Sequence, residues 1–537
     1  MSSPKKFDLS VYLVTDSSLL PPGATLVDHV LKAIRGGATI VQLREKKMAT
    51  RDFIKLGREL HEATKPLGVP LLINDRVDVA VAVGCEGIHV GWDDCSYEDA
   101  RKLLGDDKII GLSVSNKEQA EKAAAAGCDY IGVGPLYATK TKPDHSPPLG
   151  TQGLRSLLEY IATLPGPEGS HWGGAWGTKV PAVAIGGINL DNLHHVMYQS
   201  VSPQHENKKY LSGIAVVSAI MASPEPEEVC KKFRKMVDEV PPFAVRQSLY
   251  IELGNAKFKS IFQNVVINRP IVHHITNNVV KNFSANVTLA LGASPIMSED
   301  MSEFSELAAF KGGLVLNMGT STREAQPMLL AAVKAANAHG NPVVFDPVGA
   351  GATSLRRETA SMVVGNSFCD VIKGNEQEIM AVYGLDNVKQ RGVDSDPAAA
   401  GSLEHKITHA KALAVRERNI VVMTGNVDIV TDGSNVCLCN DGHGFMGDVT
   451  GTGCSLGSVI AACLAANPLD KFVATCAAVC AYSAAARVAA GKKDVHGPAS
   501  WQVAFLDTLY QLRHCREDAP QKGYPWWESL AERVEKR

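Results

Sequence analysis

The sequence has no excess of charge of either sign. Its 537 residues include 54 Lys and Arg against 57 Asp and Glu, a net charge of −3, with a pI near 6.6. A nucleic-acid surface needs a basic patch, and nothing in this balance points to one. Aromatic residues are scarce at 6%, while there are 47 glycines. This composition favours an α/β enzyme over a β-sandwich, and 45% hydrophobic residues can fill real cores.

Signals for export, membrane insertion and thiolate metal sites are also missing. The segment Met1–Tyr12 has no apolar core, so neither a signal peptide nor a transit helix is predicted. The most apolar stretches, Ser455–Ala466 and Phe472–Ala486, fall short of the roughly 18 residues that span a bilayer. The twelve cysteines contain no Cys-x-x-Cys pair, so neither zinc nor a disulfide framework is indicated. We expect a cytoplasmic protein with no membrane or nucleic-acid partner.

The first 240 residues alternate between β-rich runs and helical patterns. The predicted strands are Val11–Thr15, Ala38–Leu43, Val69–Ile73, Gly87–Val90, Lys108–Val114, Asp129–Val133, Val180–Ile185 and Ile214–Val217. The predicted helices are Arg51–Ala63, Tyr97–Leu104, Lys117–Ala126, Leu154–Leu164 and Glu227–Val240. Parallel neighbours need helical crossovers, so eight such units predict a (β/α)8 TIM barrel, with a doubly wound sheet as the alternative. Two insertions, Pro165–Thr178 and Ser200–Lys209, are expected to be surface loops.

The remaining chain predicts a second, layered α/β domain. We expect a domain over 1–240, a linker over 241–259 and a domain over 260–537. The predicted strands are Gly313–Asn317, Pro342–Phe345, Val371–Lys373, Ile420–Thr424, Asp428–Thr431 and Val436–Cys439. Long alanine-rich helices are predicted at Ser455–Ala466, Phe472–Ala489 and Trp501–His514.

Polar residues collect at successive strand ends of the first half, where a barrel carries its chemistry. They are Gln42, Arg44 and Lys46, then Asn74 and Asp75, Asp94, Ser113, the run Gly132–Lys142, Gly186 and Gly187, and Val217 and Ser218. Mg²⁺ takes one or two carboxylates and otherwise phosphate oxygens and water, while Arg and Lys bind phosphate. The pattern therefore predicts a site for Mg²⁺ and a diphosphate.

Each of these residues has a plainer interpretation when it is taken alone. Arg44 or Lys46 is more often a solvated charge, and Asn74-Asp75 is more often a turn. Gly186-Gly187 can be a tight bend, and His89 by default packs in a core. The coincidence of all of them at consecutive strand ends favours the site.

These motifs together resemble thiamine phosphate synthase over about residues 8–238. The matching strings are Gln-Leu-Arg-Glu-Lys, Asn-Asp, Gly-Ile-His-Val-Gly, Gly-x-Gly-Pro-x-x-x-Thr-x-Thr-Lys, Gly-Gly-Ile and Val-Val-Ser-Ala-Ile. The resemblance implies that a pyrimidine-methyl cation forms by loss of diphosphate and is trapped by a thiazole phosphate. It implies Mg²⁺ ligands Asp75 and Asp94; diphosphate contacts Arg44, Lys46, Asn74, Ser113 and Lys142; pyrimidine neighbours Gln42 and His89; and thiazole phosphate contacts Thr139, Thr141, Gly187, Val217 and Ser218.

The strongest local signal in the second half is the run Gly447–Cys454, which opens a long apolar helix. Glycines at a helix N-terminus leave free N–H groups that suit a transferring phosphoryl group. The run lacks the Gly-Lys-Ser/Thr ending of a Walker A loop, and by itself a glycine-rich helix cap is an equally ordinary interpretation.

With its neighbours, this run resembles hydroxyethylthiazole kinase, of the ribokinase-like fold, across about residues 262–535. The supporting strings are His273–Asn278, Gly292–Met297, Asn317–Thr320, Asp346–Ala352, Lys373–Glu378 and Thr424–Asn426. The resemblance implies phosphoryl transfer from ATP to a thiazole alcohol, and a homo-oligomer built on kinase-domain trimers. It implies thiazole contacts Met297, Gly451 and Asn277; ATP contacts Lys373 and Thr424; and Mg²⁺ carboxylates Asp346 and Glu378. Lys373 stands where the family leads us to expect arginine. Lysine keeps the positive charge but lacks the bidentate guanidinium of arginine.

Cys454 occupies the position where the wider fold uses an aspartate base. A helix N-terminus lowers a thiol pKa, so we expect partial thiolate and a base or positioning role, the alternative being a small buried helical residue. Two functional alternatives stay open at this point. One half can be a binding or assembly module, or both halves can be enzymes acting on other substrates, such as a sugar phosphate and a small alcohol.

Overall fold

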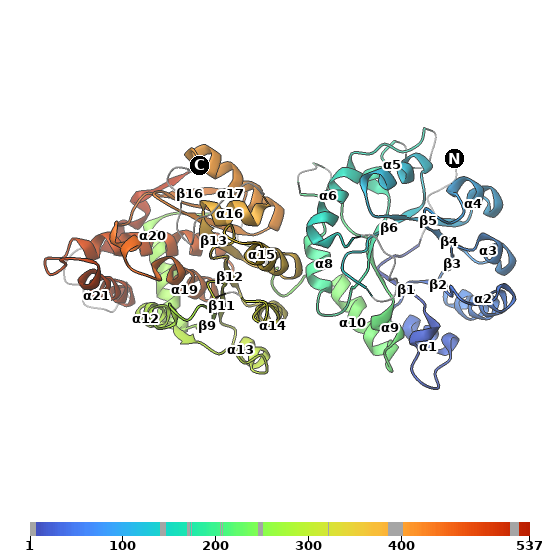
Figure 1. The fold of residues 1–537 in the computed structure, drawn as a ribbon, viewed down its shortest axis with the longest axis horizontal. Coiled ribbons are helices and arrows are strands. Elements are labelled where there is room, and N and C mark those ends of the chain that lie inside the picture. Colours follow the sequence, from blue (N-terminus) through green and yellow to red (C-terminus); the bar gives the residue numbers. More distant parts are fainter. Residues whose placement is uncertain are drawn as a thin grey trace. The chain divides into compact units, whose positions relative to one another are not determined.

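The protein forms two compact units, residues 1–241 and 242–537. The computed structural model describes residues 7–139, 147–168, 172, 174–203, 206, 208–244, 247, 251–320, 322–384, 401–515 and 526–537. Figure 1 shows a ring of strands surrounded by helices in the first unit and a broad sheet between helices in the second.

The first unit is a closed barrel of eight parallel strands. The strands are β1 (Val11–Val14), β2 (Ile40–Leu43), β3 (Leu71–Asn74), β4 (Gly87–Val90), β5 (Ile109–Val114), β6 (Tyr130–Val133), β7 (Ala182–Ile185) and β8 (Gly213–Val216). The helices are α1 (Leu26–Arg35), α2 (Thr50–Thr64), α3 (Val77–Val83), α4 (Tyr97–Leu104), α5 (Lys117–Ala126), α6 (Gly150–Ala162), α7 (Trp176–Lys179), α8 (Leu193–Gln199), α9 (Ser218–Met221) and α10 (Pro226–Asp238). Because β1 pairs with both β2 and β8, the sheet has no edge. The barrel prediction is confirmed, and the doubly wound alternative is wrong.

Alternation along each barrel strand separates two cores. Val11 and Leu13 of β1 belong to the large cluster between strands and helices, whereas Tyr12 and Val14 belong to a smaller one with Tyr130. Period-2 side-chain geometry requires this separation, and it directs the polar residues of the strands into the barrel.

The two insertions are not simply surface loops, so that prediction is wrong. Trp176 is fully buried and donates from its indole nitrogen to the Cys128 carbonyl at 3.2 Å. Trp172 is also buried. In the second insertion, Lys209 is buried and donates to the carbonyl of Val180. Apolar and paired polar side chains in these segments therefore extend the core beneath the barrel helices.

The second unit is a layered α/β domain with a nine-stranded mixed sheet in the order β10-β9-β11-β12-β13-β14-β15-β16-β17. Its strands are β9 (Ile271–Ile275), β10 (Ser294–Ile296), β11 (Gly313–Asn317), β12 (Val343–Asp346), β13 (Val371–Asn375), β14 (Ile420–Thr424), β15 (Asp428–Thr431), β16 (Val436–Cys439) and β17 (Val534–Lys536). The strands from β10 to β14 are parallel, and β15 to β17 are antiparallel. The predicted layered fold class is confirmed.

Helices cover both faces of this sheet. They are α11 (Asn255–Asn268), α12 (Lys281–Leu291), α13 (Phe304–Ala309), α14 (Gln326–His339), α15 (Ser354–Asn366), α16 (Glu376–Tyr383), α17 (Leu403–Glu417), α18 (Phe445–Asp448), α19 (Thr452–Ala466), α20 (Lys471–Ala490) and α21 (Pro498–Tyr510). One core packs α11, α12 and α19 to α21 on one face, and a second packs α13 to α17 on the other. The central strands are buried on both sides, so they read as continuous apolar runs.

Part of the segment expected to be a linker packs on the second unit. Helix α11 begins at Asn255, inside the predicted linker. The Phe243 ring stacks on Phe368 with centroids 4.8 Å apart, and the Gln247 amide donates to the Pro468 carbonyl at 3.2 Å. Composition alone does not distinguish this packed segment from a flexible linker.

Helix α20 is longer than predicted. At 20 residues it is long and apolar enough to cross a membrane by length and composition alone, but 89% of its most apolar window is buried within the protein. A core helix passes the same test, and α20 lies in the centre of one core of the second unit.

Candidate active sites

The segment after β2 brings two cations to the barrel mouth. The Arg44 guanidinium lies 4.0 Å from Asp16, and Lys46 Nζ lies 3.3 Å from a carboxylate oxygen of Asp75, which follows β3. The Arg44 amide donates to the Thr15 hydroxyl at 2.9 Å, so the loop after β1 fixes the start of this segment. Both cations therefore lie beside carboxylates that follow neighbouring strands.

Asp75 and Asp94 lie within hydrogen-bonding reach of each other. Burial, followed by the neighbouring Asp75, raises the pKa of the Asp94 carboxyl. The Gly91 amide donates to Asp94 at 2.8 Å and fixes its orientation. Asp75 has φ 61°, a left-handed conformation that costs energy for a residue with a Cβ. Two carboxylates held together beside Lys46 fit a divalent cation, because the cation would relieve their mutual repulsion.

Ordered polar side chains extend from the mouth into the barrel. His89 of β4 contacts the Ser113 hydroxyl of β5 through Nε2 at 3.0 Å and the Tyr130 hydroxyl through Nδ1 at 2.8 Å. The Gln42 amide donates to the Tyr12 hydroxyl at 2.7 Å. Asn74, at the end of β3, is also largely buried. The predicted residues of β2 to β5 therefore meet at one end of the barrel.

The structure describes four of the five residues predicted for the thiazole phosphate. Gly187 follows β7 with φ +67°, and a Cβ there would lie 2.7 Å from Cβ of Tyr137, so only glycine fits. Val217 and Ser218 form the turn from β8 into the short helix α9. Thr139 lies after β6, half-buried. Thr141, and the predicted diphosphate ligand Lys142, lie outside the described residues.

In the second unit, Gly451 is the N-cap residue directly before α19. It has φ +92°, and a Cβ there would lie 2.8 Å from Val280, so the turn requires glycine. The Tyr482 hydroxyl, buried on α20, donates to the Thr452 carbonyl at 2.7 Å and contacts the Ser455 hydroxyl at 2.7 Å. The helix N-terminus, with its free N–H groups, is thus held in place by the neighbouring core helix.

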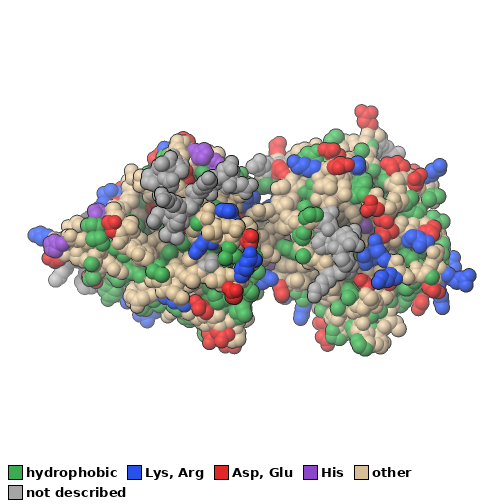
Figure 2. Space-filling view, in the orientation of Figure 1, with side chains coloured by type: hydrophobic (Ala, Val, Ile, Leu, Met, Phe, Trp, Pro, Cys, Tyr) green, Lys and Arg blue, Asp and Glu red, His purple; other side chains and the backbone are tan. Residues whose placement is uncertain are grey.

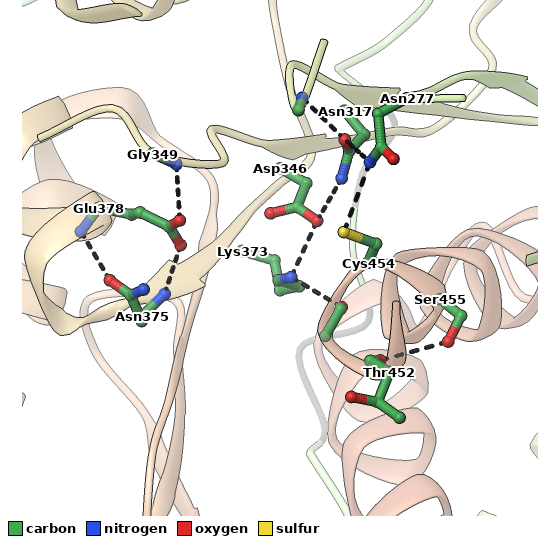
Figure 3. A network of polar contacts seen from close by, with 12 residues as sticks. Asn277, Asn317, Asp346, Gly349, Lys373, Asn375, Glu378, Thr452, Cys454 and Ser455 are labelled. Atoms are coloured by element: carbon green, nitrogen blue, oxygen red, sulfur yellow. Dashed lines mark hydrogen bonds and ion pairs between the residues drawn. The ribbon is translucent and has the colours of Figure 1, made fainter. Parts of the chain in front are cut away.

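A chain of polar contacts connects four strand ends to this helix (Figure 3). The Lys373 ammonium lies 2.9 Å from Asp346 and donates to the Gly453 carbonyl at 2.8 Å. The Asn317 amide donates to the same Asp346 oxygen at 2.8 Å. Asn277 in turn donates to Asn317 at 3.0 Å, and its nitrogen lies 3.8 Å from Cys454 Sγ. Lys373, Asp346, Asn277 and Cys454, predicted separately, form one network.

The two predicted kinase carboxylates fit a bound cation. Asp346 Oδ1 is buried and has no hydrogen-bond partner among the residues that the structure describes. Burial, followed by the charge of Asp346, raises the pKa of Glu378 to about 7, although the amides of Gly349 and Asn375 each donate to it at 2.8 Å. Among the described residues no group of three or more His, Cys, Asp or Glu could hold a metal. A pair of carboxylates is what Mg²⁺ uses when phosphates complete its shell.

The Cys454 thiol is not activated in the way that the sequence predicts. Burial, followed by the charge of Asp346, raises its pKa to about 11. The expected partial thiolate is therefore wrong for this environment: removal of water and a nearby carboxylate outweigh the helix N-terminus and Lys373.

Met297 and Thr424 lie at strand ends of the same sheet. Met297 directly follows β10, which runs parallel to β9, the strand that leads to Asn277. Thr424 ends β14 opposite Asn375 of β13. Because these strands are parallel, their carboxyl ends share one edge of the sheet. Met297 and Thr424 thus bracket the network around Asp346.

Sequence reasoning missed several residues that organise these sites. Tyr12 and Tyr130 sit within apolar strands and looked like ordinary core aromatics. Asn317 joins Asp346 to Asn277. Asp428 accepts from the Gly425 amide at 3.0 Å beside Thr424, and burial raises its pKa to about 6. Asn317 is a polar residue at the end of an apolar strand, and this pattern could have identified it as a site residue.

Two family models match the chain, each over one unit. The thiamine monophosphate synthase model matches residues 11–220 and the hydroxyethylthiazole kinase family model matches residues 262–515. A probable thiamine biosynthetic bifunctional enzyme of Schizosaccharomyces pombe is 40% identical, covering 95% of this chain and 96% of that protein. The chain belongs to the bifunctional thiamine biosynthetic enzymes.

Two further relatives agree with this assignment. The thiamine biosynthetic bifunctional enzyme of Saccharomyces cerevisiae is 38% identical over 98% of both chains. A hydroxyethylthiazole kinase of Moorella thermoacetica is 44% identical, covering 47% of this chain and 91% of that protein. The chain is therefore a bifunctional transferase with an N-terminal synthase half and a C-terminal kinase half, in the predicted order. The alternative of a half that serves only binding or assembly is not favoured.

Proposed function

We propose that the kinase half transfers the γ-phosphoryl group of ATP to the hydroxyethyl group of 4-methyl-5-(2-hydroxyethyl)thiazole. The synthase half then joins the thiazole phosphate to 4-amino-2-methyl-5-diphosphomethylpyrimidine and releases diphosphate. The observation that carries the proposal is the meeting of Lys46, Asp75 and Asp94 at adjacent strand ends. A cation beside paired carboxylates suits a diphosphate leaving group together with its Mg²⁺.

In the synthase half, catalysis acts mainly on the leaving group. Arg44, Lys46, Asn74, Ser113 and Lys142 are proposed to take up the charge of the departing diphosphate. Charge that develops in a water-poor site is stabilised most by donors that are already in position. Mg²⁺, held by Asp75 and Asp94, would neutralise phosphate oxygens when bound. The C–O bond breaks before the new C–N bond forms, so no general base is needed.

The remaining synthase residues orient the two organic rings. Gln42 and His89 would contact the pyrimidine, and His89 lies 3.0 Å from the hydroxyl of Ser113, a proposed diphosphate ligand. Thr139, Thr141, Gly187, Val217 and Ser218 would hold the thiazole phosphate through hydroxyl groups and backbone amides. The segment after β6 packs closely on Gly187, where a Cβ would lie 2.7 Å from Cβ of Tyr137, so the two loops proposed to hold the phosphate lie side by side.

In the kinase half, the N-terminus of α19 is proposed to stabilise the transferring phosphoryl group. Met297, Gly451 and Asn277 would contact the thiazole alcohol, and Lys373 and Thr424 the nucleotide. Mg²⁺, held by Asp346 and Glu378, would offset charge on the ATP phosphates when bound. Cys454, protonated at neutral pH, would position the alcohol through the contact network.

We further propose a cytoplasmic homo-oligomer built on kinase-domain trimers. Val279 and Met301 are 73% and 54% exposed, and they lie close in sequence to Asn277 and Met297. Exposed apolar side chains beside a substrate site suit an interface. Light scattering coupled to gel filtration tests this oligomer.

A coupled assay tests the function. Purified full chain receives ATP, Mg²⁺, thiazole alcohol and pyrimidine diphosphate, and thiamine phosphate is measured. Asp75→Ala should abolish thiamine phosphate while thiazole phosphate accumulates. Cys454→Ala should slow the coupled reaction, and added thiazole phosphate should restore it.

The outcomes separate the two halves. No product from either entry point would overturn the proposed substrates. Pyridoxal and ribose, offered to the kinase half as competing alcohols, should be phosphorylated far more slowly than the thiazole alcohol.

A further inference from the structure

Five side chains from five strands form a continuous hydrogen-bonded chain inside the barrel. The Gln42 amide donates to Tyr12 at 2.7 Å, and the Tyr12 and Tyr130 hydroxyls are 2.8 Å apart. Tyr130 lies 2.8 Å from His89 Nδ1, and His89 Nε2 lies 3.0 Å from the Ser113 hydroxyl. Gln42 and Ser113, the two ends, were both assigned to the pyrimidine diphosphate site. The tyrosines between them have no assigned role.

Glycines on β5 and β6 leave the space that this hydrogen-bonded chain of side chains occupies. A Cβ at Gly111 would lie 2.0 Å from Cζ of Tyr130, and one at Gly132 would lie 3.1 Å from Cε1 of His89. The Tyr12 and Tyr130 side chains are 1% and 0% exposed. A buried hydroxyl without a partner costs about 1–3 kcal/mol, so each proton in the chain needs an acceptor.

Counting protons gives the chain a direction. Tyr12 accepts from Gln42, so its own single proton goes to Tyr130. Tyr130 has then accepted, and its proton goes to His89 Nδ1. A neutral imidazole that accepts at Nδ1 carries its proton on Nε2 and donates it to Ser113 Oγ.

The Ser113 hydroxyl, having accepted, keeps its own proton for a group outside the chain. We propose that Tyr12 and Tyr130 are positioning residues of the synthase, which set the tautomer of His89 so that Ser113 donates its proton to the leaving diphosphate. This inference rests on the proposed function of the synthase half.

The opposite direction would work against the reaction. Ser113 would then donate its proton to His89 and direct only lone pairs at the anionic diphosphate. A hydroxyl that donates to a charged oxygen forms a stronger bond than one between neutral groups. Because the diphosphate gains charge as the C–O bond breaks, the donating arrangement favours the transition state over the ground state.

The first test separates kcat from KM. Tyr130→Phe should lower the synthase kcat about tenfold or more, with the KM for the pyrimidine diphosphate changed less than about threefold, because the lost donor acts mainly in the transition state. Tyr97→Phe, which removes a hydroxyl from the outer helix α4, is the matched control and should keep wild-type kinetics. Thermal melts of the synthase unit in each full-length variant show whether the barrel is folded, and the kinase rate reports the total amount of protein.

The second test is a double-variant cycle. If Tyr130 acts through Ser113, Tyr130→Phe should have little further effect on kcat in a Ser113→Ala background. Effects that multiply would overturn the proposal, because they would mean that Tyr130 acts independently of the serine hydroxyl.

The third test does not depend on activity. With ¹⁵N-labelled histidine, two-bond ¹⁵N–¹H spectra of the full chain report the tautomer of each ring, and His89→Gln assigns the signal. We expect the Nε2–H tautomer in the wild type and a loss of that preference in Tyr130→Phe. An Nδ1–H tautomer in the wild type would overturn the inference even if thiamine phosphate is made. A wild type that makes no thiamine phosphate but shows the Nε2–H tautomer would instead overturn the proposed function, and with it the role of the chain.

Discussion

Lys373 and Asp346 form an ion pair at 2.9 Å with both side chains buried, 5% and 1% exposed. Asn317 also donates to this Asp346 oxygen, so Asp346 is held between a charge and an amide. Lys373 also donates to the Gly453 carbonyl, so the buried ion pair lies directly at the N-terminus of α19.

Lys373→Met should disable the kinase. An unpaired buried carboxylate costs about 3–5 kcal/mol, so the kinase unit should melt earlier and its kcat/KM should fall by about 100-fold or more. Lys373→Arg keeps the charge and should retain kinase activity within about tenfold. Initial rates and thermal melts check this, with the synthase rate as the internal control. An unchanged kinase rate in Lys373→Met would contradict the role of the pair.

Cys454→Ala should lower the kinase kcat more than KM, whereas Cys454→Asp should retain measurable activity. Because the pKa of the thiol is raised to about 11, only about one in 10⁴ molecules carries the thiolate at pH 7. Because the protonated thiol is proposed to position the alcohol and the rare thiolate is not needed, we expect no thiol-dependent rise of kcat from pH 7 to 9. A tenfold rise per pH unit that disappears in Cys454→Ala would identify the thiolate as the base.

His274 should make the kinase unit less stable in acid. Burial lowers the pKa of this ring to about 4, and Nδ1 has no hydrogen-bond partner in the described part of the chain, while Nε2 contacts Ser458 at 2.9 Å. The unfolded ring, with a pKa near 6.5, binds its proton more readily. The contribution of His274 to the free energy of unfolding is therefore complete above pH 6.5 and is lost as the pH falls toward 4, by about 2 kcal/mol between pH 7 and 5.

Urea titrations that follow hydrogen exchange of the β9 segment measure this loss. His274→Gln, which does not titrate, should lose less stability over the same pH range. The neighbouring His273, whose pKa is also lowered by burial, and Glu378 and Asp428, whose pKa values are raised by burial, remain in both proteins and together set the residual slope. Equal pH slopes for the two proteins would exclude His274 as the source.

Gly187→Ala should raise the KM for the thiazole phosphate about tenfold, because the new methyl group would meet Tyr137 at 2.7 Å and displace the backbone. Gly23→Ala is a matched control, since Gly23 has φ +80° and open space around its Cβ position. It shares the backbone strain but not the clash. Steady-state synthase kinetics of both variants distinguish a local effect on the site from general destabilisation.

The sequence predicted most of the fold because its strands are short, apolar and well separated. Strands such as Gly313–Asn317 and Val436–Cys439 were predicted with their observed limits. The missed strands have weaker patterns: β10 contains a proline, β17 is charged, and β9 carries two histidines. Edge strands tolerate proline and charge, so their composition resembles that of loops.

Motifs located site residues but not their electrostatic surroundings. The placement of Asp75 beside Asp94 follows from parallel strands that end at one rim. The pKa of Cys454 does not follow, because it depends on burial and on Asp346, which is more than 100 residues away in sequence. Tyr12 and Tyr130 were indistinguishable from packing residues until their hydroxyl groups were seen to meet.

The separate cores of the two units have a genetic consequence. Each unit buries its own apolar residues and carries the side chains of its own site. A substitution confined to one site should therefore leave the other half folded and active. Two alleles, one defective in the synthase half and the other in the kinase half, should complement each other when expressed in the same cell, provided that thiazole phosphate diffuses between molecules.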